Sequence, residues 1–227
     1  MAKSAFQYMY DAAVNTFLYA YNSIPHVGHS HPKVVTAGQR QMAKLNTNTC
    51  YLFDEIPAYA EKLLAKFPKS MNRVFFVNSG SAASDLAIRI AKIHTQKQSI
   101  MVMEHGYHGH AQLATDISDY KFNHPKGQGQ KGFIIKTEIS ATFGGRYSDK
   151  GAGKKYDQDA INKIKKTRDG IAAFICEPIV GCGGQVPLAK GYLKELYTAI
   201  RAQGSVCISD EVQTGFGRLG DYIFWGG

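Results

Sequence analysis

Short apolar runs alternate with amphipathic segments from about residue 70 onward, and this alternation constrains the fold more than any other feature of the sequence. The runs have the length and composition of buried strands, and the segments between them place apolar residues at helical spacing. We expect strands at 73–77, 99–105, 132–137, 171–178 and 205–209, and helices at 81–94, 157–168 and 188–203. This order predicts an α/β domain over residues 70–227, with a mostly parallel sheet flanked by helices.

Residues 1–69 differ from this pattern and are expected to form a separate N-terminal segment. It contains two predicted helices, at 32–45 and 56–67, joined by a polar stretch. Polar motifs, in contrast, follow the predicted strands of the later domain: NSGS after Val77, HGYHGH after Glu104, EP after Cys176 and DEVQ after Ser209. Ligands of parallel α/β sheets collect at the carboxyl ends of strands, so these motifs are the candidate site.

The NSGS motif, residues 78–81, lies between a predicted strand and the start of a predicted helix. A glycine and two hydroxyls at a helix N-terminus can form an anion site, because free N–H groups and the helix dipole point toward it. A phosphate is then the expected ligand. Alternatively, Ser79 or Ser81 only caps the helix and Gly80 eases the turn. The motif lacks both GK[ST] and GxGxxG, so a nucleotide is not favoured.

Histidines recur at the same spacing in two places, at 26, 29 and 31 and at 105, 108 and 110. Three histidines could bind zinc or a similar metal. Neither set is in helical register, however, and no carboxylate lies between the histidines, so no metal site is expected. Tyr107, within the second set, offers a flat aromatic ring at a strand end that can stack on a planar ligand.

Asp210 and Glu211 follow the last predicted strand and point to opposite faces of it. A carboxylate at the end of an apolar strand needs a cation. With a phosphate site and a stacking ring nearby, the protonated ring nitrogen of pyridoxal phosphate fits this requirement, because an adjacent carboxylate keeps such a nitrogen protonated. We expect Asp210 to face the ring and Glu211 to face away.

NSGSAASDLAIRIAK, EHGYHGH, ICEPIVGCGG, ISDEVQTGFGRLG and HVGHSHPKVV together resemble the class III aminotransferases, pyridoxal-phosphate enzymes of the aspartate-aminotransferase fold. The sequence is most similar to the alanine–glyoxylate aminotransferase 2-like branch, which includes phospho-lyases of phosphorylated amines. The resemblance implies that Asp210 is catalytic and pairs with the pyridinium. It also implies that the remaining cofactor contacts come from Ser79, Gly80, Ser81, Tyr107, His108, Glu177, Val212 and Gln213.

The resemblance also implies an amino-group transfer between an amine or amino acid and a keto acid or aldehyde, in a homodimer. Ala82 and Cys182 depart from the family, since many relatives carry Glu at both positions. The second departure favours a phospho-lyase-like substrate. No lysine of this sequence matches the family's Schiff-base lysine, so we expect a fragment, incomplete at both ends, that does not turn over alone.

Composition limits the other classes of function. The excess of 27 Lys and Arg over 18 Asp and Glu is scattered along the chain apart from a helical cluster at 161–168, so nucleic-acid binding is not expected. No long apolar run predicts a membrane span, and no signal-peptide pattern is present, so we expect a cytoplasmic protein with reduced cysteines. A non-catalytic binding protein and a histidine metal protein remain as alternatives.

Overall fold

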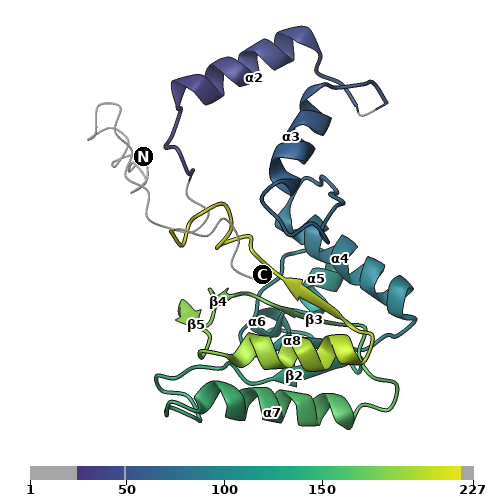
Figure 1. The fold of residues 1–227 in the computed structure, drawn as a ribbon, viewed down its shortest axis with the longest axis vertical. Helices are drawn as coiled ribbons and strands as arrows, with labels where there is room; N and C mark the ends of the chain where they lie inside the picture. Colours follow the sequence, from purple (N-terminus) through teal and green to yellow (C-terminus); the bar gives the residue numbers. More distant parts are fainter. Residues whose placement is uncertain (1–24, 49, 221–227) are drawn as a thin grey trace. The chain divides into compact units, whose positions relative to one another are not determined.

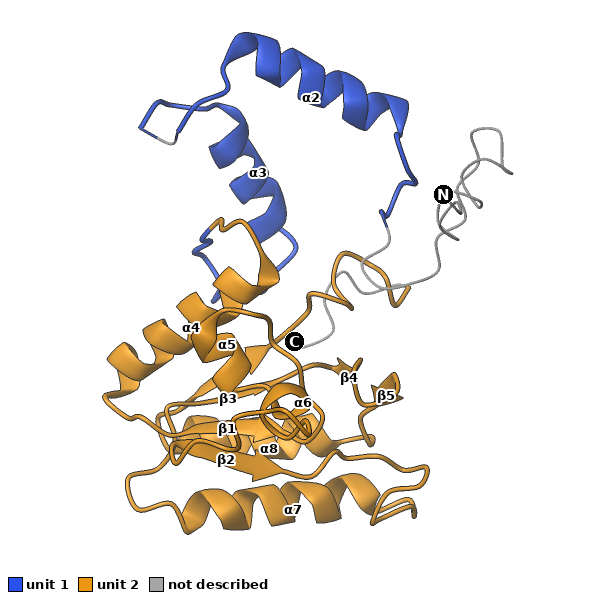
Figure 2. Ribbon diagram, turned by 180° about the vertical axis from the view of Figure 1, so that it is seen from behind, with its two compact units in different colours: residues 1–75 blue, residues 76–227 orange. Residues whose placement is uncertain are grey.

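The structure is a computed structural model of the chain, and it describes residues 25–48 and 50–220. The chain divides into two compact units, residues 1–75 and 76–227, which are described separately (Figure 2). From the family resemblance, residues 1–69 are expected to be part of a small domain with connecting helices, and residues 70–227 an incomplete cofactor-binding large domain. This division stays a prediction.

The first unit contains the helices α2 (Pro32–Lys44) and α3 (Glu55–Leu64), close to the two predicted helices. Pro32 occupies the first turn of α2, where its missing N–H costs nothing. Neither helix buries a residue. Within the described residues, no helix is long and apolar enough to cross a membrane.

The second unit is built on a parallel sheet of four strands in the order β2-β1-β3-β6. These strands are β1 (Ile100–Met103), β2 (Ile134–Thr137), β3 (Ala173–Cys176) and β6 (Val206–Ser209). All coincide with predicted strands, and the predicted α/β class is confirmed. Since the strands run in the same direction, their carboxyl ends lie along one edge.

Helices cover both faces of this sheet (Figure 1). On one face, α4 (Gly80–Thr95), α5 (Gln112–Asp116) and α6 (Asp119–Phe122) pack with Ile100 and Val102. On the other face, α7 (Ala152–Lys165) and α8 (Tyr192–Ala202) pack with Met101 and Met103. Alternate residues of β1 thus belong to different cores, and all four are buried, which explains why the strand is apolar throughout.

The strand predicted at 73–77 is wrong: these residues pair with no strand among the described residues, and Phe75 is 65% exposed. An apolar run becomes a strand only when another strand satisfies its N–H and C=O groups. The hairpin of β4 (Ile179–Val180) and β5 (Val186–Pro187) was not predicted. Helix α7 begins earlier than expected, and α8 begins only after Gly191, whose φ is 87°.

Candidate functional site

The N-terminus of α4, the loop after β1 and the turn after β6 meet at the carboxyl edge of the sheet. A Cβ atom at Gly80 would lie 2.6 Å from Val212 Cγ2, and one at Gly109 would lie 2.6 Å from Ser81 Cα. Such close approaches require glycine at both positions. The NSGS, HGYHGH and DEVQ motifs are therefore neighbours in space, although up to about 130 residues of sequence separate them.

The start of α4 shows the helix cap that the sequence left open as one alternative. Ser79 Oγ accepts a hydrogen bond from the N–H of Ala82 at 3.2 Å, so Ser79 caps the helix. Among the described residues, no acceptor is bonded to the N–H groups of Gly80 or Ser81. Both donors lie at the positive end of the helix dipole, and they suit an anion.

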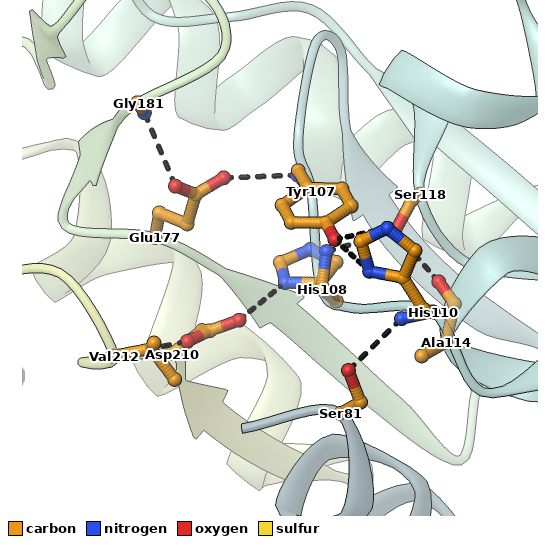
Figure 3. A network of polar contacts seen from close by, with 10 residues as sticks. All are labelled: Ser81, Tyr107, His108, His110, Ala114, Ser118, Glu177, Gly181, Asp210 and Val212. Atoms are coloured by element: carbon orange, nitrogen blue, oxygen red, sulfur yellow. Dashed lines mark hydrogen bonds and ion pairs between the residues drawn. The ribbon is translucent and has the colours of Figure 1, made fainter. Parts of the chain in front are cut away.

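Asp210 is paired with His108 in the interior of the site (Figure 3). His108 Nδ1 lies 2.8 Å from Asp210 Oδ2, and the side chains are 0% and 6% exposed. Asp210 Oδ1 accepts the N–H of Val212 at 3.2 Å. Each carboxylate oxygen keeps a second lone pair, so Asp210 can still accept a proton donor from a ligand.

Glu211 has different partners from Asp210. Its Oε1 accepts from the Ser209 hydroxyl at 3.2 Å, and its Oε2 accepts from the Thr214 hydroxyl at 2.9 Å. These contacts brace the turn after β6. The two adjacent carboxylates thus serve separate purposes, one inside the site and one in the turn.

The loop after β1 is held by side chains. The N–H of His105 donates to Asp119 and that of His108 to Ser118, both at 2.8 Å. The N–H of Tyr107 donates to Glu177 and that of His110 to Ser81, both at 2.9 Å. Asp119 and Ser118 belong to the start of α6, and sequence reasoning missed both. Neither has a periodic or motif signal, although Asp119 also pairs with Lys136 at 3.1 Å and the Ser118 hydroxyl donates to the Ala114 carbonyl at 2.6 Å.

Tyr107 presents its ring within this loop. Its hydroxyl is hydrogen-bonded to His110 Nδ1, and Lys121 Nζ lies 5.4 Å from the ring centroid. Burial raises the pKa of the Tyr107 hydroxyl, with a smaller contribution from Cys182. Burial likewise raises the pKa of the Cys182 thiol, which Glu177 raises further and Lys121 lowers.

Glu177, expected among the cofactor contacts, uses both carboxylate oxygens on backbone donors. Oε1 accepts from Tyr107 and Oε2 accepts from the N–H of Gly181 at 3.1 Å. Gln213 is close to this turn, because a Cβ at Gly181 would lie 3.2 Å from Gln213 Nε2. The nine candidate residues thus form one connected set in the second unit.

The histidines of the loop do not converge. His108 faces Asp210, whereas His110 contacts Tyr107. Within residues 25–48 and 50–220, no group of three potential metal ligands is found. The arrangement gives no support to the alternative of a histidine metal protein.

The sequence profile described as aminotransferase class-III matches residues 2–225. The chain belongs to this family. The resemblance drawn from the motifs is therefore confirmed, as is the aspartate-aminotransferase-like fold. For class III aminotransferases, family membership and solved relatives support pyridoxal phosphate as the cofactor.

Individual relatives lie in the expected branch. The Drosophila melanogaster protein "Alanine–glyoxylate aminotransferase 2-like" is 41% identical over 227 residues, covering 96% of this chain and 46% of the relative. "Ethanolamine-phosphate phospho-lyase homolog 1" of Caenorhabditis elegans is 37% identical, covering 97% of this chain and 50% of the relative. A solved Arthrobacter phospholyase in complex with phosphoethanolamine is 35% identical with a TM-score of 0.78, covering 91% of this chain and 49% of the neighbour. The chain spans about half the length of the curated relatives it matches.

The site fits the cofactor of this family. Free N–H groups at the start of α4 suit its phosphate, and the buried carboxylate of Asp210 suits its ring nitrogen. Val212 is 55% exposed beside Gly80, so an apolar surface is available to a planar ring.

Proposed function

We propose that residues 76–227 are the pyridoxal-phosphate-binding part of a class III enzyme whose complete form is an aminotransferase. It would transfer an amino group between an amine or amino acid and a keto acid or aldehyde. The observation that carries this proposal is the buried pair of Asp210 and His108 beside the open N-terminus of α4. A buried acid with a histidine partner, next to an anion site, matches the two ends of this cofactor.

Seven of the nine site residues have a proposed role in binding the cofactor. Gly80 and Ser81 bind the phosphate, Tyr107 and Val212 contact the faces of the ring, and Gln213 binds the ring hydroxyl. Asp210 holds a proton at the ring nitrogen, and His108 orients Asp210 by donating from Nδ1. When bound, the cofactor supplies an electron-accepting ring. The carboxylate is then the catalytic group, because it stabilises the charge that develops during reaction.

A second candidate, a phospho-lyase acting on a phosphorylated amine, is favoured by the surroundings of Cys182. The position holds a thiol close to Lys121, whose ammonium group lies over the Tyr107 ring. An anionic substrate group would meet the Lys121 cation here, and position 182 itself adds no carboxylate to that of Glu177. In the complete protein, release of inorganic phosphate from phosphoethanolamine would support this candidate. Amino transfer to a keto acid without phosphate release would support the first.

We further propose a homodimer and a small-molecule amine substrate, as the family resemblance implies. The cytoplasmic location stays a prediction, and some relatives are named as mitochondrial. The expected lack of nucleic-acid and membrane partners also stays a prediction.

The test of cofactor binding uses pyridoxamine 5′-phosphate, which has an amine in place of the aldehyde and needs no lysine of the protein. Titration calorimetry should detect saturable binding to the chain. Asp210→Asn should weaken it about tenfold, since the ring nitrogen loses its anionic partner, equivalent to about 1.4 kcal/mol. Asp85→Asn, on the surface of α4, is the matched control and should bind as wild type. Equal binding by all three proteins, or no binding by wild type, would refute the proposal.

A further inference from the structure

Glu177 joins the loop after β1 to the turn between β4 and β5. It follows β3, and its carboxylate accepts N–H groups from Tyr107, 70 residues earlier, and from Gly181, four residues later (Figure 3). The residue is only 5% exposed. Burial raises its pKa, while the two N–H donors and the nearby His108 oppose that rise. The chain thus places an acidic group in a costly position, where it serves backbone groups.

This geometry fixes Tyr107 at both ends. Glu177 holds the backbone N–H, and His110 contacts the hydroxyl at the tip of the ring. A ring anchored at the backbone and the tip has little freedom to tilt. Any planar ligand that stacks on Tyr107 therefore meets a surface whose orientation is already set, which lowers the entropic cost of binding.

We infer that Glu177 is a positioning residue: its carboxylate locks Tyr107 in the orientation that stacks on the cofactor, and it does not itself bind the cofactor. This inference deepens the proposed function and rests on it. It replaces the expectation that Glu177 contacts the cofactor directly.

The chemistry requires a carboxylate at this position. Two N–H donors need two acceptor oxygens, and a glutamine would present one oxygen and one NH2 group. The NH2 group would face a backbone N–H, which leaves one of the two donors without an acceptor. Glu177→Gln therefore tests the carboxylate specifically, because it keeps the size of the side chain and removes a buried charge. Glu195→Gln, an exposed residue of α8, is the matched control.

The first test needs no ligand. Amide hydrogen exchange, followed by NMR on the purified chain, should show Tyr107 and Gly181 protected in wild type and in Glu195→Gln. In Glu177→Gln, at least one of these two amides should exchange about tenfold faster or more, while amides of β1 and β3 keep their rates. Unchanged exchange at both amides would overturn the inference, whether or not any cofactor binds.

The second test separates positioning from a general structural effect by a double-mutant cycle. Pyridoxamine 5′-phosphate binding is measured for Glu177→Gln, Tyr107→Leu and the double variant. If Glu177 acts through Tyr107, each single change weakens binding, and the double variant is weakened by clearly less than the product of the two factors. If the double variant is weakened by the full product of the two factors, the inference is overturned. Wild-type affinity in Glu177→Gln would overturn it as well. Absence of binding in wild type would refute the proposed function instead. The exchange result would still decide whether Glu177 holds the N–H groups of Tyr107 and Gly181.

Discussion

Gly80 and Val212 are in contact across the edge of the sheet, so close that a Cβ atom at position 80 would lie 2.6 Å from Val212 Cγ2. The start of α4 and the turn after β6 consequently fit together without space for one further methyl group. The proposed phosphate site and a proposed ring contact share this junction.

Gly80→Ala should weaken binding of pyridoxamine 5′-phosphate about tenfold or more, because Val212 must shift, although alanine is the better helix former by about 1 kcal/mol. Calorimetry of the purified variant measures the affinity. Val212→Ala in the same chain removes both Cγ atoms and should recover part of the loss. If Gly80→Ala bound as wild type, the packing at this junction would not control the site.

Gly109→Ala should destabilise the protein more than Gly129→Ala. Both glycines have positive φ, 121° and 75°, so alanine is strained at either position, by about 1 kcal/mol or more. A Cβ at Gly109 also meets Ser81 Cα at 2.6 Å, whereas nothing lies within 4 Å of one at Gly129. Urea unfolding of both variants gives the two free energies. Equal losses would contradict the close approach of the loop to α4.

Asp210→Ala should lower the free energy of unfolding by about 1–3 kcal/mol, because His108 Nδ1 then loses its partner inside the protein. Asp85→Ala removes a surface contact to Arg89 at 3.8 Å and should cost no more than about 0.5 kcal/mol. Urea denaturation at neutral pH compares the two. A loss no larger than that of Asp85→Ala would show that the buried pair is not intact.

Cysteine alkylation should divide the four thiols by exposure. Burial raises the pKa of Cys176 from its ordinary value of 9.0 to about 12 and that of Cys207 to about 11. At pH 8 both stay protonated and unreactive, because only the thiolate is a nucleophile. Exposed Cys50 should react first, and mass spectrometry of the peptides gives the order. Labelling of Cys176 at the rate of Cys50 in the folded protein would contradict the buried position.

Protonation of Cys176 also determines how the free energy of unfolding changes at alkaline pH. Since the pKa of Cys176 is higher in the folded than in the unfolded chain, its stabilising contribution is complete below about pH 9. It is lost progressively between about pH 9 and pH 12. The free energy of unfolding should therefore fall as the pH rises above 9, when it is measured under reducing conditions.

The sequence predicted the two central strands, β1 and β3, well because every residue of both is buried. Ile100 to Met103 contribute to two cores in alternation, and such a strand is apolar at every position. Residues 74–77 of the run at 73–77 are equally apolar, and the run still pairs with no described strand. An apolar composition predicts that a segment is buried, but it does not predict whether another strand is available to pair with it.

The sequence indicated candidate residues for the site, but it did not indicate the contacts between them. His108 and Asp210 are 102 residues apart, and no spacing rule connects them; the family resemblance does. Glu177 was expected to contact the cofactor, whereas its use of both oxygens on backbone N–H groups had no signal in the sequence. Ser118 and Asp119 were missed for the same reason, since hydroxyl and carboxylate groups that bind loop backbone follow no periodicity.

The loop at 105–110 takes its shape from side chains of α4, α6 and β3, and its His108 pairs with Asp210 after β6. These partners are distant in sequence, so the loop cannot reach its final form until they have assembled around it, and contacts of long separation form slowly. During synthesis, residues 105–110 leave the ribosome about 100 residues before Asp210 does. The pair of His108 and Asp210 can therefore form only when synthesis has passed β6, and we expect the pocket to be completed late in folding.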